Sequence, residues 1–173
     1  MGLMNLVVNK EPKSVEWIEG GMLWDICMYK LAGIPTAEQL LVFAQDKDLK
    51  KVLNMGIDNL IIPHIVKIRD FLLKEGLPAP AMPDRKLKGD NKEAYSTSNI
   101  LTDADIANAL REVFRHGLNI EIQGIAKGTR ADINYLIKDI LNEDIDGYIN
   151  LVKLSYAKNW ISMTPALPSQ PPQ

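Results

Sequence analysis

The chain has 173 residues, of which 46% are apolar, and its 20 Lys and Arg residues against 22 Asp and Glu residues give a formal net charge of -2. This composition predicts one globular domain with a buried core, and the dispersed, slightly acidic charge argues against nucleic-acid binding and against a polybasic membrane anchor. No apolar run reaches the roughly 18 residues of a membrane span, and the single cysteine, Cys27, excludes an intramolecular disulfide and a cysteine-based zinc cluster. We therefore expect no contact with membranes, no secretion and a reducing, cytoplasmic setting.

The first predicted helix runs from an N-cap at Ser14 to about residue 45. Apolar residues recur here and along most of the chain at helical spacing, and the alternation typical of strands is missing, so the fold class is all-α. Because Pro35 has no amide hydrogen, we expect a kink or a short break at residues 33–35. A capping box from Thr36 to Gln39 would restart the helix.

The second predicted helix begins at its N-cap Asp46 and ends at Gly76. Pro63 lies inside it and leaves the carbonyl of Asn59 without its helical partner, which predicts a bend. Residues 77–101 follow, rich in proline and then in charge. Such a long connection suits a crossover between two helical hairpins.

The third predicted helix begins at Thr102 and stops at Gly128, and Thr129 caps a fourth helix that runs to about Met163. Two hairpins joined by one long crossover are typical of a ferritin-like four-helix bundle with up-down-down-up order. The bundle would span residues 14–163, between an N-terminal segment of residues 1–13 and a proline-rich tail of residues 164–173.

Polar residues interrupt the inward apolar face of each predicted helix. Counting 1.5 Å per residue from the turns places Tyr29, His64 and Glu121 at one level of the bundle, with Asp25 flanking them one turn away. The same count places Asp144 a turn or two nearer the other end.

Two interpretations of this group remain open. Tyr29 and Glu121 would satisfy the two ring nitrogens of His64 in a buried hydrogen-bonded trio. Alternatively, His64, Glu121 and Asp25 would hold iron or manganese, as in a metal-dependent oxidase or a metal store. The chain contains no Glu-x-x-His motif, which argues against a complete di-metal site and favours the absence of a cofactor.

A second apolar stripe on each of the first two helices points away from the bundle interior. Trp24 and Met28 mark it on the first helix, and Ile62 and Val66 mark it on the second. A lone bundle need not bury these side chains, so they are candidates for a homodimer interface. A third possibility is a carrier of a small apolar molecule, because the two proline bends, Gly33 and Gly56 would leave space inside the bundle.

Several short motifs resemble the spore-coat-F-like family of spore-forming bacteria. They are Leu23-Trp24-x4-Tyr29, Phe43 with residues 46–49, Leu77-Pro78-x-Pro80, Arg130-x-Asp132 and Pro165-x-x-Pro168. The resemblance implies a ferritin-like bundle, often present as two units in tandem, and no enzymatic activity is established for the family. We therefore expect a non-enzymatic structural or interaction component, associated with the spore or the sporulating cell, with itself and other spore coat proteins as partners.

Overall fold

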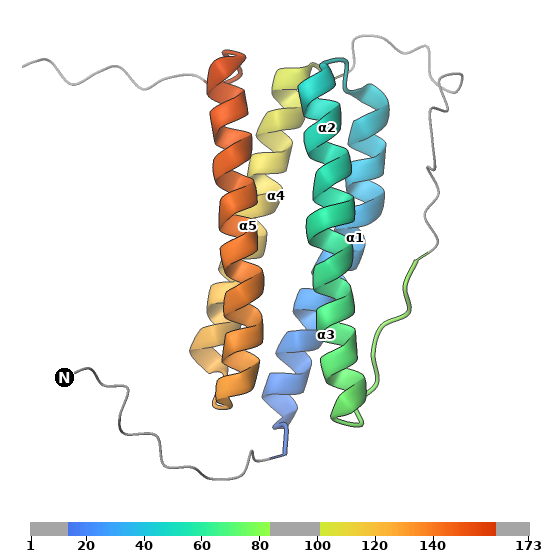
Figure 1. The fold of residues 1–173 in the computed structure, drawn as a ribbon, viewed down its shortest axis with the longest axis vertical. Coiled ribbons are helices and arrows are strands. Elements are labelled where there is room, and N and C mark those ends of the chain that lie inside the picture. The colour runs from blue at the N-terminus through green and yellow to red at the C-terminus, as the bar shows by residue number, and fades with distance from the viewer. Residues whose placement is uncertain (1–13, 84–100, 162–173) are drawn as a thin grey trace, which may run out of the picture.

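The computed structural model describes residues 14–83 and 101–161, and these residues form helices and connecting segments without any strand (Figure 1). The predicted all-α class is confirmed. The helices are α1 (Trp17–Phe43), α2 (Lys47–Met55), a π-helix (Gly56–Ile61), α3 (Ile62–Lys74), α4 (Asp103–Lys127) and α5 (Ala131–Ala157). Because α2, the π-helix and α3 follow one another without a break, the described residues form four rods. The predicted N-terminal segment, residues 84–100 of the crossover and the proline-rich tail lie outside the described residues.

The four rods pack side by side around one core, with α1 against α3 and α4, and α5 against α4 and the π-helix. Polar contacts join the rods at both ends. At one end the Arg130 guanidinium, at the start of α5, donates two hydrogen bonds of 2.7 and 3.0 Å to Glu75, at the end of α3. At the other end the Lys158 ammonium, after α5, lies 2.7 Å from Asp46 and 2.8 Å from Asp48.

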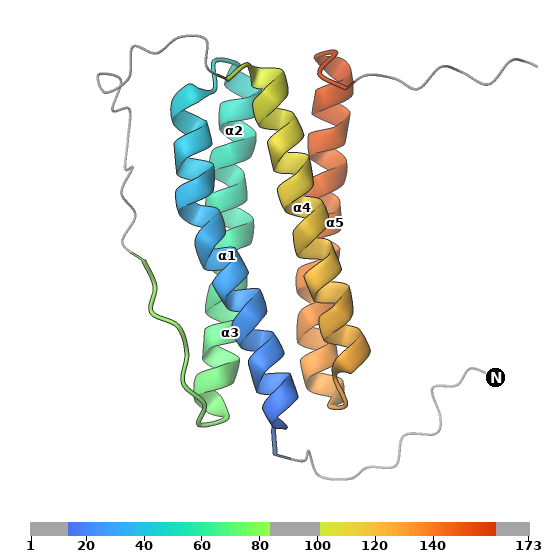
Figure 2. The same cartoon turned by 180° about the vertical axis from the view of Figure 1, so that it is seen from behind.

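Helix α1 differs from its prediction at its start and at Pro35. It begins at Trp17 after an N-cap at Glu16, and not at Ser14, because the Glu16 amide donates to the Glu19 carboxylate at 3.0 Å. The helix continues through Pro35 without a break, and Figure 2 shows that α1 is bent along its length. The Thr36 hydroxyl donates to the Ala32 carbonyl at 2.9 Å, so the predicted capping box is absent and the side chain bonds back along the helix instead.

The second rod contains a π-helix where a bend was predicted. Pro63 cannot donate to the carbonyl of Asn59, and its ring would collide with that carbonyl in an α-helix. The π-helix ahead of it takes the wider register, in which the Ile62 amide donates to the Ile57 carbonyl. The predicted end at Gly76 is confirmed. Gly76 has a φ of 73°, a conformation that glycine adopts without steric cost.

Helices α4 and α5 confirm two of the predicted boundaries and correct two others. Thr102 caps α4, and α4 ends before Gly128, as predicted. Helix α5 begins after Arg130 and not after Thr129, because the amides of both residues are bound by a side chain from α1. It ends at Ala157, well before Met163, because Asn159 turns left-handed with a φ of 58°.

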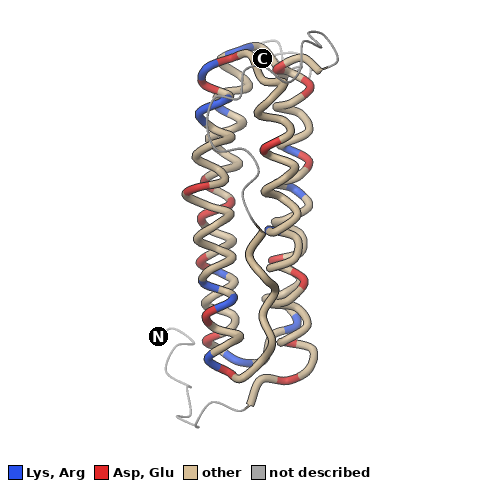
Figure 3. Tube along the Cα trace, turned by 90° about the vertical axis from the view of Figure 1, so that its right-hand side faces the viewer, with Lys and Arg blue, Asp and Glu red and all other residues tan. Residues whose placement is uncertain are grey.

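The core is formed by apolar side chains from all four rods. Charged residues of both signs are distributed along the helices in the view of Figure 3. Within the described residues, each helix is too short or too polar to cross a membrane.

The residues that follow α3 cover part of the stripe proposed as an interface on α1. Ala79, Pro80 and Pro83 line a hollow together with Trp24 and Met28, and Pro80 is buried. Figure 2 shows this segment running beside α1 and α3. The chain itself therefore covers part of the α1 stripe, while Val66 on α3 stays 42% exposed.

Candidate functional site

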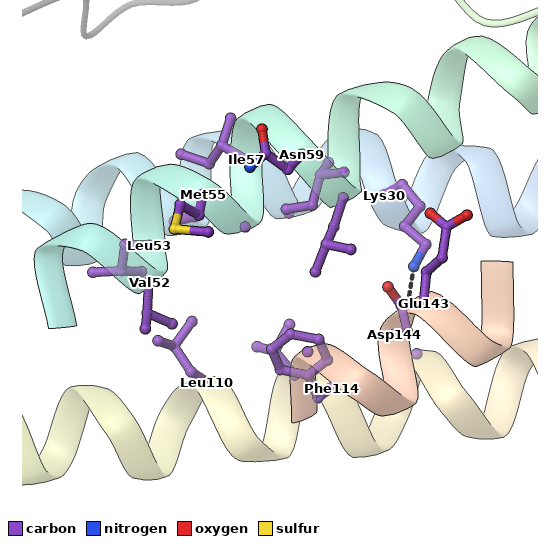
Figure 4. Close-up of a pocket in the computed structure, with 18 of the residues that line it drawn as sticks. Lys30, Val52, Leu53, Met55, Ile57, Asn59, Leu110, Phe114, Glu143 and Asp144 are labelled. Carbon is purple, nitrogen blue, oxygen red and sulfur yellow. Dashed lines mark hydrogen bonds and ion pairs between the residues drawn. The ribbon is translucent and has the colours of Figure 1, made fainter. Parts of the chain in front are cut away.

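A cavity of about 400 Å³ lies between the rods in the half of the bundle nearest α2 (Figure 4). All four rods contribute to its wall, and most of the wall is apolar. The side chains labelled in Figure 4 that surround the apolar part come from α2, the π-helix and α4: Val52, Leu53, Met55, Ile57, Leu110 and Phe114.

Small residues and the π-helix explain why this part of the bundle is not filled. Gly33 on α1 and Gly56 in the π-helix both line the cavity. A Cβ atom built on Gly56 would meet nothing within 4 Å, and one on Gly33 would only touch the Ile61 side chain at 3.4 Å. These are the two glycines for which the sequence predicted interior space. The π-helix adds to it by altering the register of the side chains on the second rod.

The cavity reaches solvent between the second rod and α5. Met55 and Asn59 on the second rod are exposed, as are Asp146 and Asn150 on α5, and all four belong to the wall. A small molecule can therefore enter from the side of the bundle.

One end of the cavity is closed by a buried charged cluster. The Lys30 ammonium on α1 forms ion pairs with Asp144 on α5 and, at 2.8 Å, with Glu121 on α4. All three residues are at most 5% exposed. Asp144 and Lys30 line the cavity directly, so this cluster supplies its polar wall.

His64 on α3 extends the cluster toward the surface. Its Nε2 atom lies 2.8 Å from Glu143 on α5, and Glu143 also accepts a hydrogen bond of 2.6 Å from the Lys67 ammonium. The His64 Nδ1 atom lies 3.5 Å from Asp144 Oδ1 and makes no hydrogen bond. His64 is fully buried, whereas the Lys67 and Glu143 side chains are about two-fifths exposed at 40% and 41%.

The environment shifts the protonation of three of these groups. Burial raises the pKa of Glu121 to about 8, and the negative charge of Asp144 raises it further, although the positive charge of Lys30 acts to lower it. Burial also lowers the pKa of His64, and the nearby Lys30 charge acts in the same direction. The hydrogen bond from Lys67 lowers the pKa of Glu143. Burial therefore favours the uncharged forms of Glu121 and His64.

The structure separates the residues of the predicted trio. His64 and Glu121 are buried as expected, but their predicted mutual contact is replaced by contacts with Glu143 and Lys30. The Tyr29 hydroxyl donates to the Val113 carbonyl instead of to His64. Asp25 is exposed, because it lies on the outer side of α1.

Three participants were missed or misplaced by the sequence analysis. Asp144 lies at the level of His64 and Lys30, and not a turn or two away, because the helices do not keep straight α-helical register past Pro35 and Pro63. Lys30 was overlooked, although it recurs at helical spacing with the buried Ile26 and Ile34. Glu143 was overlooked because it lies at the edge of its helix face.

The cluster does not fit a metal ion. In the described part of the chain, no group of three or more His, Cys, Asp or Glu residues is arranged to bind one. The Lys30 ammonium stands between Glu121 and Asp144, so the positive charge that a metal would bring is already supplied by the protein. A second cation there would meet electrostatic repulsion.

Comparison with protein families identifies the chain. The sequence model of a family described as "Protein of unknown function (DUF3231)" matches residues 5–171, so the chain belongs to this family. A search of curated proteins finds no match.

Three solved structures share the fold. A "putative spore coat protein" from Bacillus halodurans is 17% identical with a TM-score of 0.79, and the match covers 91% of this chain and 98% of that one. A two-domain protein from Anabaena variabilis with DJ-1/ThiJ/PfpI-like and ferritin-like domains is 14% identical with a TM-score of 0.66, covering 90% and 41%. A conserved hypothetical protein from Mycobacterium tuberculosis is 13% identical with a TM-score of 0.63, covering 81% and 99%.

Proposed function

We propose that this member of the DUF3231 family is a non-enzymatic bundle that binds a small, mostly apolar molecule in its interior. The cavity between the rods carries this proposal, because its volume of about 400 Å³ lies within the range of small-molecule sites. Protein interiors otherwise contain few voids larger than a water molecule.

Water is a poor occupant of such a cavity. Ordered water needs two to four polar partners, and the wall offers them only at its charged end and at its mouth. An apolar ligand would instead restore contacts along the wall formed by α2, the π-helix and α4. The side opening gives that ligand a route in.

Filling the cavity tests this function. The Gly33→Leu variant places a side chain in the cavity, whereas Gly21→Leu makes the same change on the exposed side of α1, where a Cβ would meet nothing within 4 Å. Both variants gain the same helix propensity. Titration with the apolar fluorescent probe N-phenyl-1-naphthylamine should show binding to the wild type and to Gly21→Leu, and loss of binding in Gly33→Leu. Absent binding, or equal binding by all three proteins, would refute the proposal.

The second candidate is a structural component of the spore coat or of the sporulating cell. The fold similarity to the Bacillus halodurans protein supports it, as do the sequence motifs that resemble the spore-coat-F-like family. The polar contacts at the two ends of the bundle support the up-down-down-up order of a ferritin-like fold. In this role the protein would act in the cytoplasm or at the spore, through contacts with itself and with other coat proteins.

The proposed homodimer would use the outer face of the second rod. Val66 is 42% exposed and Ile62 lies beside it; on α1, Trp24 is half-buried beside the segment after α3 and Met28 is 46% exposed. Light scattering should give twice the 19.4 kDa chain mass for the wild type and a monomer for Val66→Glu. Ile122→Glu, which changes a 53% exposed isoleucine on α4, should stay dimeric. A monomeric wild type, or a dimeric Val66→Glu variant, would contradict the proposed interface.

A further inference from the structure

Apart from its mouth, the cavity is polar mainly at one end. In Figure 4 Val52, Leu53 and Leu110 lie at one end of the open space, and Lys30, Glu143 and Asp144 lie at the other. A ligand that satisfies both ends must therefore have an apolar body and a single polar head.

The cavity is also elongated along the bundle. Three helices line it over similar lengths, from residue 29 to 37 on α1, from 110 to 117 on α4 and from 143 to 150 on α5. Seven residues of helix correspond to about 10 Å at 1.5 Å per residue. An extended octyl chain has about this length, so a linear alkyl molecule matches the space.

The charges at the polar end select the head. Glu143 and Asp144 face the cavity with Asp146 at its mouth, so a carboxylate head would meet carboxylates of the protein. An ammonium head would lie next to the Lys30 ammonium, which already pairs with both Glu121 and Asp144. A carboxylate head is therefore opposed by several like charges, and an ammonium head is opposed by the Lys30 charge.

A hydrogen-bond acceptor faces the cavity at the same place. If uncharged His64 donates from Nε2 to Glu143, its Nδ1 atom is an acceptor. That atom lies 3.5 Å from Asp144 Oδ1 and has no hydrogen-bond partner, but His64 is not part of the cavity wall. Asp144 does line the cavity, so a hydroxyl group that reaches it there would donate to its carboxylate.

We propose that the ligand is a linear alkyl alcohol, or a molecule with the same alkyl chain and hydroxyl head, with the hydroxyl bonded to Asp144 and the chain directed toward Leu53 and Leu110. This inference rests on the proposed binding function, because it names the ligand class of the same cavity. The alkyl chain would supply affinity through burial, and the hydroxyl would supply orientation.

Isothermal titration calorimetry at pH 7 with 1-octanol, octanoate and octylamine tests the inference, because these probes share one alkyl chain length and differ in their polar head group. The expected result is that 1-octanol binds about tenfold tighter than either charged probe. Tighter binding of octanoate or octylamine would overturn the inference.

Two variants locate the head. Glu143→Gln removes a negative charge from the polar end, so it should reduce the difference in affinity between 1-octanol and octanoate. Glu112 is exposed on α4 and lies outside the cavity, so Glu112→Gln should leave that difference unchanged. Asp144→Asn should weaken 1-octanol about tenfold. If Glu143→Gln leaves the affinity difference between 1-octanol and octanoate unchanged, the polar group of the ligand does not lie at this end of the cavity.

The outcome also separates this inference from the proposed function. If N-phenyl-1-naphthylamine binds in a manner abolished by Gly33→Leu but no octyl probe binds, the ligand class is wrong and the binding function stands. If neither kind of probe binds, both fail.

Discussion

Replacing Lys30 by methionine should destabilise the bundle more than any exposed ion-pair variant. The change keeps the length of the side chain and removes its charge. Lys30 and Asp144 are each 5% exposed and Glu121 is 1% exposed, so the lost charge has no solvent to replace it. Removing one partner of a buried ion pair costs about 3–5 kcal/mol, because the other charge stays buried and unpaired. We expect a loss of this size in the free energy of unfolding.

The loss should depend on pH. Without Lys30, the Asp144 carboxylate must either stay charged in the core or take up a proton. Proton uptake is easier at low pH, so the variant should lose more stability at pH 8 than at pH 5. Adding Asp144→Asn to Lys30→Met removes the buried charge and should recover part of the loss.

Lys67→Met is the matched control for this experiment. Lys67 pairs with Glu143 at 2.6 Å, but the two side chains are 40% and 41% exposed, so their pair is screened by solvent. Exposed pairs contribute about 0–1 kcal/mol. Urea unfolding of the three proteins at pH 5 and pH 8, followed by circular dichroism, gives the comparison. Equal losses in Lys30→Met and Lys67→Met, or a pH-independent loss in Lys30→Met, would refute the reasoning.

Three further variants test other parts of the structure in the same unfolding assay. Burial raises the pKa of Glu121 from 4.5 to about 8, so between these two pH values the folded state binds a proton that the unfolded state has released. The contribution of Glu121 to the free energy of unfolding therefore falls as the pH rises from 4.5 to about 8, by at most about 1.4 kcal/mol per pH unit. Glu121→Gln should abolish that contribution, and an unchanged pH slope would contradict it. Glu19→Gln should cost about 1–2 kcal/mol at pH 7 and less at pH 3, since the stabilisation by the wild-type carboxylate is lost as the pH falls below 4.5 toward its lowered pKa; an equal cost at both pH values would contradict this. Gly76→Ala should destabilise by about 1 kcal/mol, because φ is 73° there, whereas Gly21→Ala should stabilise by up to about 1 kcal/mol. The same sign for both glycines would be the contrary result.

Local signals in the sequence predicted helix boundaries well where the cap is made by neighbouring residues. Asp46 binds the amides of Asp48 and Leu49, and Thr102 forms a capping box with Asp105, so both starts can be read from a few adjacent letters. Gly76 ends its helix for an equally local reason. These contacts do not depend on how the rods pack.

The start of α5 shows where local signals fail. The amides of Thr129 and Arg130 both donate to Glu19, at 2.7 and 2.9 Å, so the cap of one helix is a carboxylate from another. Burial raises the pKa of Glu19, but the hydrogen bonds from the Glu16, Thr129 and Arg130 amides together lower it. Glu19 is 110 residues from Thr129 in the sequence. No local pattern connects the two.

The candidate site was partly predictable for a related reason. The apolar stripe identified His64, Glu121 and Asp144 as inward polar residues, and all three are buried. Their partners depend on the axial level of each side chain. The bend of α1 (Figure 2) and the π-helix before Pro63 change that level by amounts that spacing along the sequence does not give. Gly33 and Gly56 still indicated interior space, because a missing side chain leaves room whatever the register.

The buried charged cluster is better explained by the cavity that it lines than by the stability of the fold. A buried ion pair gives no more stability than well-packed apolar residues of the same volume, so Lys30, Glu121 and Asp144 are not explained by stability. The ammonium of Lys30 pairs with the carboxylate of Asp144, and burial favours the uncharged forms of Glu121 and His64. The interior end of the cavity is therefore polar and can orient a hydroxyl group. We therefore attribute the cluster to selection among apolar ligands by their heads.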